Sequence, residues 1–293
     1  MKPFLPGRLY AFFLSLLLIT FTACEEDVDK PTNNPPAGEA NVVTGVVQDT
    51  KGQPMAGVKV RAVNTASGGN TFVDATTDNN GRYTLKTSFL GGWTMVAWKT
   101  VTTPDGDTYH LRIAGATDAD YEPFTPGENA IVRNFKWKLS GVIPDRPQAA
   151  DFSTGYFGGS LRFVNDHYRD NSDAVTEMPV GTVITVTLTP VNGAKYLDGS
   201  PATQVITKSF TIAARTPRNV NYYIGDIPVT AYSVTAKTST GANVYLGRDE
   251  FNYDDHLANA AAVFFPEGLS MGSYESGVGV GAASNFPYFM SKR

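Results

Sequence analysis

The stretch VVTGVVQDTKGQPMAGVKVRAVN, residues 42–64, decides the expected fold of this chain. It begins with a β-branched run, residues 42–49, and continues through a turn rich in Gly and Pro. Residues 58–64 then alternate with period two, so Val58 and Val60 share one face. β-branched segments separated by Gly and Pro turns are typical of antiparallel strands. The stretch therefore predicts a strand, a turn and a second, half-buried strand.

A polar corner follows in DATTDNNGRYTLKT, residues 74–87. Its acids and amides suit a metal-binding loop, a catalytic acid cluster or the corner of a hairpin. An EF-hand is excluded because Leu85 stands where the bidentate Glu is required. Residues 79–81 can instead supply positive-φ positions, and Asp78 can hydrogen-bond the turn backbone. We therefore expect a hairpin corner, and an irregular calcium site at this loop stays open.

These segments, with GGWTMVAWK after them, resemble the carboxypeptidase regulatory-like domain family. The resemblance covers about residues 42–100. It implies a transthyretin-like, or prealbumin-like, seven-stranded β-sandwich in a superfamily that resembles starch-binding modules. In the zinc peptidases that give the family its name, such a sandwich is an appendage of a separate catalytic segment. The matching elements are a G-x-V strand, a G-x-P-[LM]-x-G-[AV] turn, a T-D-x-x-G-x-[YF] hairpin and a final strand, at residues 45–47, 52–58, 77–83 and 92–96.

The whole chain favours an all-β fold with two tandem Ig-like or prealbumin-like β-sandwich domains. Its 293 residues are enough for two cores, and 28 Gly, 18 Pro and 12% aromatics suit many short strands. The second half repeats the order of the first more loosely, with residues 140–145 as its first strand and residues 258–267 as its last. The expected domains are a signal peptide at 1–23, a lipidated N-terminus and flexible tether at 24–41, one sandwich at 42–139, a second sandwich at 140–266 with an insertion near 146–178, and a Gly/Ser-rich segment at 267–293.

The N-terminus resembles a bacterial lipoprotein signal. Lys2 and Arg8 precede an apolar run that is short for a membrane-spanning helix, and small residues precede the only cysteine, Cys24. The resemblance implies lipidation at Cys24, attachment to the outer membrane and display at the cell surface. Phe21 departs from the usual Leu, and an ordinary signal peptide with a spare cysteine or an uncleaved anchor are the alternatives. The acidic run that follows suits either a surface-export tag or a solvated charge run.

Composition excludes some partners. The net charge is −4, and it becomes −6 without Lys2 and Arg8, because 22 basic residues then face 28 acidic ones. Such a chain has no basic footprint for a nucleic acid, so we expect none as a partner. The expected partners are the membrane, through the N-terminal lipid, and either a glycan or an outer-membrane protein.

Motifs for catalysis are not found in the sequence. None of the three histidines begins an H-x-x-E or H-E-x-x-H pair, and the lone cysteine is assigned to lipidation. The tail contains a literal G-x-S-x-G at residues 268–272, but no Asp or His follows it. We therefore expect no enzyme, no catalytic residue, no cofactor and no metal. Irregular oxygen-rich calcium sites stay open at residues 166–173 and 249–255.

Aromatic side chains are the remaining candidates for a ligand site, because sugar-binding sandwiches stack rings on exposed aromatic faces. Alternation separates Trp93 and Met95 from Trp98. The family resemblance implies that Trp93 and Met95 lie in the core, which leaves Trp98 as the outward ring. Tyr156 and Phe157 lie in a Gly-flanked segment that suits a contact surface. Trp98, Tyr156 and Phe157 are the expected ligand-binding residues, with buried packing rings as the alternative.

These observations favour a non-catalytic, lipid-anchored envelope protein that acts as a binding module. Carbohydrate is the first expected ligand, by analogy with the superfamily. The alternative is a structural spacer, or a protein-interaction module of an outer-membrane complex.

Lipidation at Cys24 is directly testable. Cells that express the chain and are fed labelled palmitate should label it, and Cys24→Ser should lose the label because the thioether can no longer form. A label that persists in Cys24→Ser would contradict the anchor.

Overall fold

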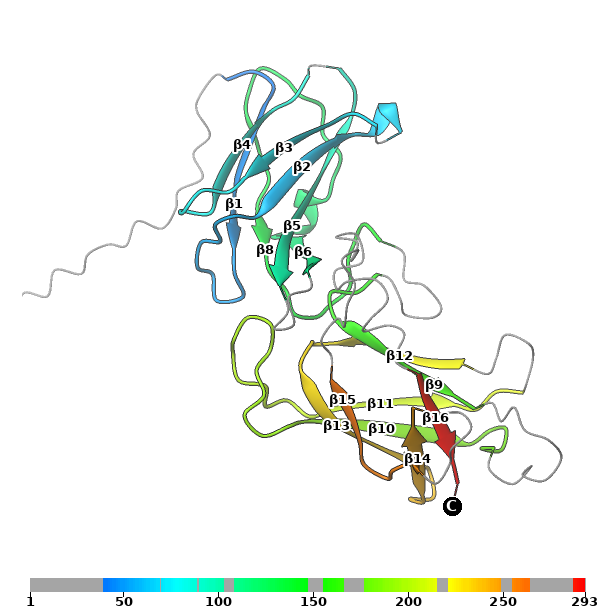
Figure 1. Cartoon of the computed structure of the whole chain (residues 1–293). Helices are drawn as coiled ribbons and strands as arrows, with labels where there is room; N and C mark the ends of the chain where they lie inside the picture. Colours follow the sequence, from blue (N-terminus) through cyan, green and yellow to red (C-terminus); the bar gives the residue numbers. More distant parts are fainter. Residues whose placement is uncertain are drawn as a thin grey trace, which may run out of the picture. The chain divides into compact units, whose positions relative to one another are not determined.

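The computed structural model describes residues 39–68, 70–88, 90–102, 108–146, 155–165, 177–214, 221–248, 255–263 and 287–292. Within these ranges the chain is almost entirely β, with two short 3₁₀ turns, Thr65–Ser67 and Asp118–Asp120. The strands form two β-sandwiches (Figure 1). The expected all-β class with two tandem sandwiches is therefore confirmed. No helix among the described residues is long and apolar enough to cross a membrane. Cys24 and the expected tether up to residue 38 lie outside the described residues.

The first sandwich is an eight-stranded arrangement in the order β3-β2-β5-β6-β8-β1-β4, with β7 paired to β1. Its neighbours are antiparallel except for β7 and β8, which run parallel to β1. The edges are therefore β3 and β4. The strands are β1 (Val42–Gln48), β2 (Lys59–Asn64), β3 (Phe72–Thr76), β4 (Arg82–Lys86), β5 (Trp93–Thr102), β6 (Thr108–Gly115), β7 (Ile131–Val132) and β8 (Phe135–Lys136).

The second sandwich has the same strand order at equivalent places, β11-β10-β13-β14-β16-β9-β12, with β15 paired to β13. The seven strands in this order therefore have counterparts in the first sandwich: β1 corresponds to β9, β2 to β10, β3 to β11, β4 to β12, β5 to β13, β6 to β14 and β8 to β16. The extra strands differ, because β7 pairs with β1 whereas β15 pairs with β13. The strands are β9 (Gly159–Val164), β10 (Val183–Pro190), β11 (Ile206–Thr211), β12 (Asn221–Ile227), β13 (Ala231–Thr238), β14 (Asn243–Gly247), β15 (Ala260–Val263) and β16 (Pro287–Ser291).

Period-two alternation places the core of the first sandwich correctly. Val58 and Val60 have no exposed surface, and Trp93 is 1% exposed in the same cluster. The glycine of the G-x-V motif has a packing reason, because a Cβ on Gly45 would lie 1.7 Å from the carbonyl oxygen of Arg133. Close strand approach, and not a special backbone conformation, therefore requires glycine at this position.

The polar corner at residues 74–87 is the turn between β3 and β4. Asp78 Oδ1 accepts hydrogen bonds from the backbone N–H groups of Asn80 and Arg82, each at 2.8 Å. Gly81 alone of the corner residues has positive φ, +69°. The stabilising role of Asp78 is confirmed, but the expected positive φ at Asn79 and Asn80 is wrong. A turn of this length needs only one left-handed residue, at its last position.

Asp49 forms the same kind of turn after β1. Its Oδ1 accepts from the backbone N–H groups of Lys51 and Gln53, each at 2.8 Å. Gly52 again supplies the positive φ, +82°. The two acidic corners of the first sandwich are therefore structural turns built to one pattern.

The expected repeat is right in its middle strands and wrong at its ends. The predicted counterparts around residues 179–193 and 221–237 contain β10, β12 and β13. The first strand is β9, however, which lies inside the expected insertion, and not residues 140–145. The last strand is β16, from the segment expected to lie outside the sandwich, whereas β15 pairs along β13. Val142 in the expected first strand makes one isolated bridge, to Tyr156, whereas Leu161 and Phe163 of β9 lie in the core.

Replacement of Asp78 tests the structural role of the corner. Asp78→Ala should destabilise the first sandwich by about 1–2 kcal/mol, because two backbone donors lose their acceptor. Asp78→Asn keeps one side-chain oxygen and should lose less. Trp93, Trp98 and Trp137 are the only tryptophans and all lie in the first sandwich, so urea unfolding followed by tryptophan fluorescence reports on it selectively. Equal stability of Asp78→Ala and the parent chain would contradict this role.

Candidate functional site

Trp98 lies on the outer face of the first sandwich, as alternation predicts, but it is buried. Its exposed fraction is 8%. The guanidinium carbon of Arg61 lies 5.2 Å from an indole ring centroid, and the His110 ring packs edge-on at 6.3 Å. The expectation that Trp98 exposes a stacking surface is therefore wrong, because side chains on the outer face pack against the indole.

The Gly-flanked segment at Tyr156 and Phe157 is not an open loop. It is hydrogen-bonded through its backbone to residues 141–143. Phe157 is 1% exposed and forms a small buried cluster with Ala114 and Ile143. The expectation of an exposed Phe157 is therefore wrong, because backbone pairing turns its ring inward. Tyr156 is half-buried, and ligand binding there stays a prediction.

One exposed ring on this outer face was missed by the sequence reasoning. Phe72 on β3 is 48% exposed, and the guanidinium of Arg61 lies 3.7 Å from its ring centroid. Arg61 also forms a two-point ion pair with Asp74, at 2.6 and 2.7 Å. The positive charge of the group is neutralised locally, so this cluster is a cross-strand packing unit and not an open cation site.

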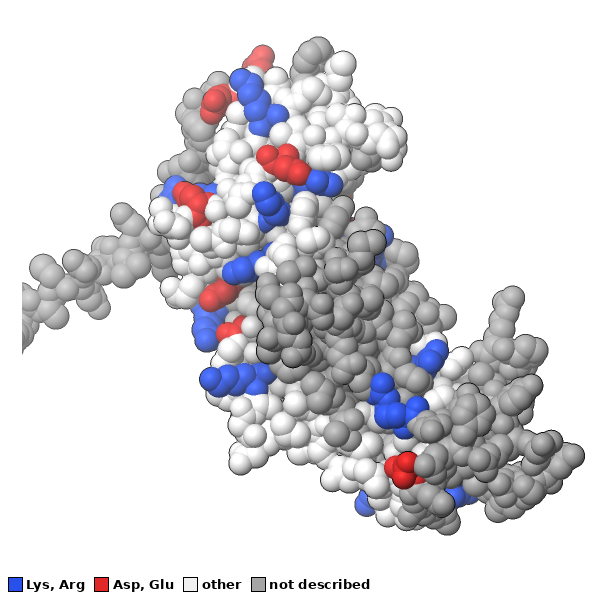
Figure 2. All heavy atoms as spheres, in the orientation of Figure 1, with Lys and Arg blue, Asp and Glu red and all other residues white. Residues whose placement is uncertain are grey.

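Charged side chains do not gather into a metal site within the described ranges, where no group of three or more His, Cys, Asp or Glu residues lies together. On the face in Figure 2, basic side chains lie singly or in small groups, with acidic ones between them. Of the segments where an irregular calcium site stayed open, residues 166–173 lie outside the described residues, and so does 249–255 apart from Asp255.

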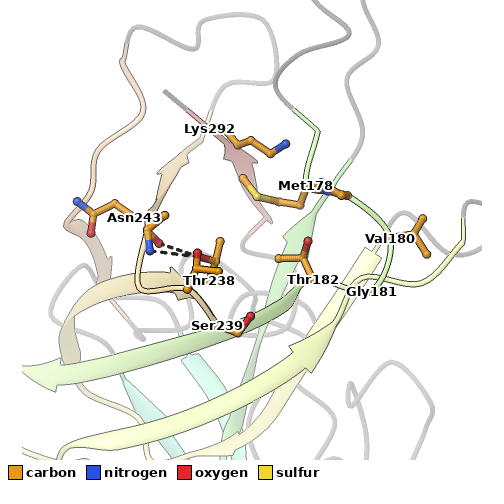
Figure 3. A pocket seen from close by; sticks show the side chains of 11 residues that line it. Met178, Val180, Gly181, Thr182, Thr238, Ser239, Asn243 and Lys292 are labelled. Carbon is orange, nitrogen blue, oxygen red and sulfur yellow. Dashed lines mark hydrogen bonds between the residues drawn. The ribbon is translucent and has the colours of Figure 1, made fainter.

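The second sandwich has a pocket of about 580 Å³ beside the start of β10 and the end of β13. Figure 3 shows Lys292 on one side of it, with Thr182 and Ser239 opposite. Met178 forms a buried apolar part of the wall, whereas Val180 is 65% exposed at the rim. The lining residues are Met178, Pro179, Val180, Gly181, Thr182, Thr238, Ser239, Thr240, Ala242, Asn243 and Lys292.

Matched hydrogen bonds relate the pocket to the first sandwich. Gly181 N–H donates to the Ile212 carbonyl at 2.8 Å, and Ile212 N–H donates to the Thr182 carbonyl at 2.9 Å. Gly57, Thr77 and Val58 make the same two bonds in the first sandwich, at 3.1 and 2.9 Å. Thr182 therefore holds the position of Val58 at the start of the equivalent strand.

The strand register extends this equivalence to the hairpin beside the pocket. Val60 pairs with Ala97 in the first sandwich, and Ile184 pairs with Thr238 in the second. Because Val60 and Ile184 each lie two residues after the matched position, Thr238 corresponds to Ala97. Strand β5 continues from Ala97 to Thr102, whereas β13 ends at Thr238. On this strand the β13–β14 hairpin is thus five residues shorter than the β5–β6 hairpin. The pocket lies where β13 ends.

The tight turn after β13 has its own hydrogen bonds. The Thr238 N–H donates to the Ala242 carbonyl at 2.9 Å, and the Thr238 hydroxyl accepts from the Ala242 N–H at 3.2 Å. Gly241 supplies the positive φ, +86°. The Thr238 hydroxyl is therefore used by the turn. The side chains of Thr182 and Ser239, in contrast, form no hydrogen bond within the described part of the chain, and both face the pocket.

Strand β16 fixes the position of Lys292. Its Tyr288 ring stacks on Phe163 with centroids 5.8 Å apart, and burial raises the pKa of Tyr288 to about 12, while Arg248 opposes that rise. Ser291 Oγ lies 2.9 Å from Nδ1 of the buried His256. The backbone just before Lys292 is therefore held in the core of the sandwich, and the lysine extends from it to the pocket.

Comparison with known proteins agrees with the fold. Residues 42–120 match the model of the carboxypeptidase regulatory-like domain. The matched residues contain strands β1 to β6 of the first sandwich. This match confirms the resemblance found in the strand and turn motifs. No curated protein sequence matches the chain.

Solved structures resemble the chain only distantly. The Streptococcal ancillary pilin is 11% identical with a TM-score of 0.25, over 78% of this chain and 60% of its own. The Bacillus anthracis TIE protein is 10% identical with a TM-score of 0.28, over 78% and 31%. The minor pilin GBS52 of Streptococcus agalactiae is 13% identical with a TM-score of 0.24, over 77% and 91%. The chain thus spans less than two thirds of the first two, and likeness at this level carries no conclusion about function.

The pocket lies outside the carboxypeptidase regulatory-like domain and was not predicted. Its residues come from three separate segments, 178–182, 238–243 and 292. A sequence signal did exist, because the segment after β13 closes its turn within four residues whereas the matching hairpin of the first domain is longer. The contribution of Lys292 had no such signal, since it depends on the pairing of β16.

Proposed function

We propose that this chain is a lipid-anchored, surface-displayed protein without catalytic function, and that it binds carbohydrate in the pocket of the second sandwich. The observation that supports the ligand site is the pocket itself, which exists because the β13–β14 hairpin is short. The anchor at Cys24 and the outer-membrane location belong to the same proposal and depend on the signal-like N-terminus.

The size and lining of the pocket suit a sugar unit. A volume of about 580 Å³ lies within the range typical of small-molecule sites. The hydroxyls of Thr182 and Ser239 can each donate and accept a hydrogen bond, as sugar hydroxyls require. The exposed Pro179 and Val180 offer apolar surface for the C–H face of a ring. This mixture replaces the aromatic stacking that we expected from Trp98.

A structural spacer is the second candidate function. Two sandwiches of identical strand order in tandem form a repeat, and two of the three expected binding rings are buried. A spacer needs stable, repeated modules and no ligand pocket. The two candidates therefore differ in whether the pocket of the second sandwich has a ligand.

Blocking the pocket tests the binding proposal. We expect the chain from residue 25 on, which lacks the signal peptide and Cys24, to bind a subset of glycans on an array. Ser239→Tyr should weaken that binding at least about tenfold, because the phenol occupies the space of the ligand. Ser239 is exposed, so the larger side chain should not disturb the core.

Ser209→Tyr is the matched control, because Ser209 is an exposed serine on β11 outside the pocket. It should bind as the parent chain does. Absence of binding to every glycan, with co-purification of a membrane protein by the anchored chain, would favour the spacer.

A further inference from the structure

We propose that the pocket of the second sandwich selects acidic sugars, and that Lys292 binds the carboxylate of a uronic acid unit. This inference depends on the proposed carbohydrate-binding function and adds the chemical class of the ligand. It starts from the charge of the lining residues. Lys292 is the one charged residue among the eleven described residues that line the pocket.

Lys292 has no partner that satisfies its charge within the described part of the chain. The ion pairs there join Arg61 to Asp74 and Arg112 to Asp145. Lys292 is half-buried and makes no hydrogen bond to a described residue. A partly buried ammonium beside apolar and hydroxyl groups attracts an anion more strongly than a fully solvated one does, because less water screens the charge.

The backbone that precedes Lys292 is held in place, so the lysine side chain starts from a fixed point beside the pocket. Ser291 is 1% exposed and is hydrogen-bonded to the buried His256. A Cβ at Gly247 of β14 would lie 1.9 Å from the His256 ring, so the imidazole occupies the space that a side chain at this position would need. The ammonium therefore reaches the pocket from a rigid strand end, so binding of an anion has to order the lysine side chain but not the backbone that carries it.

The chemistry around Lys292 identifies the kind of anion. A phosphate carries up to two charges and is typically bound by several cations, an Arg fork or a cluster of backbone N–H groups. This pocket offers one ammonium, which matches the single charge of a carboxylate. Thr182 and Ser239 face Lys292 across the pocket and suit the neutral hydroxyls of the same ring (Figure 3). A sugar ring with one carboxylate satisfies both sets of groups.

The test compares sugars that differ only at one carbon. Glucuronic, galacturonic and mannuronic acids are titrated into the chain from residue 25 on, beside glucose, galactose and mannose. Amide chemical shifts in β10, β13 and β16 are followed by NMR. We expect at least one acid to bind about tenfold more tightly than its neutral parent, and the difference to shrink with added salt. Lys292→Met should remove the difference, whereas Lys292→Arg should keep most of it.

The outcomes separate the two proposals. Equal binding of an acid and its neutral parent, or an acid preference that survives in Lys292→Met, would overturn the role of Lys292 and leave carbohydrate binding standing. Amide chemical-shift changes confined to residues outside β10, β13 and β16 would contradict the location of the site in both proposals. No binding of any of the six sugars, together with an empty glycan array, would overturn the proposed function itself.

Discussion

Strand β16 is hydrogen-bonded on both edges, and the second sandwich depends on this pairing. It runs parallel to β9 and antiparallel to β14, so without it two inner strands would become edges. Its Tyr288 and Met290 are almost completely buried in the core. The same strand ends at the pocket and presents Lys292 there. Fold and candidate site therefore share one element, which comes from the very end of the described chain.

The two sandwiches share one order of main strands but differ in their loops. The order of their seven main strands and the hydrogen bonds at the start of β2 and β10 are the same, so the positions along these strands can be matched. The differences lie in the extra strands and in the loops. In the first sandwich the hairpin after Ala97 is long, whereas in the second sandwich the hairpin after Thr238 is short. Loop length on a conserved framework is a common source of new sites. Here it leaves a pocket in the second sandwich.

Local chemistry made much of the first domain predictable. Alternation put Val60 on one face of its strand with Val58, and the family resemblance placed Trp93 in the core; all three are buried. Asp78 was recognised as a turn residue because a carboxylate two positions before a backbone N–H can accept from it. Exposure was harder to predict. Trp98 faces outward as expected, yet its burial depends on Arg61 and His110, which lie on other strands. Strands β9 and β16 were missed because pairing partners far apart in sequence, and not their own patterns, define them. The place of Lys292 at the pocket follows from the pairing of β16, so it was not predictable either.

We propose that the short β13–β14 hairpin creates the ligand site of the second sandwich. Replacing residues 239–241 with the longer connection of the first domain, residues 98–112, should rebuild the missing hairpin over the pocket while β16 stays paired. Titration calorimetry of the grafted chain against a glycan that the parent chain binds measures this directly. We predict loss of binding with unchanged protection of β16 amides from hydrogen exchange. Unchanged affinity in a grafted chain with β16 still protected would contradict the claim.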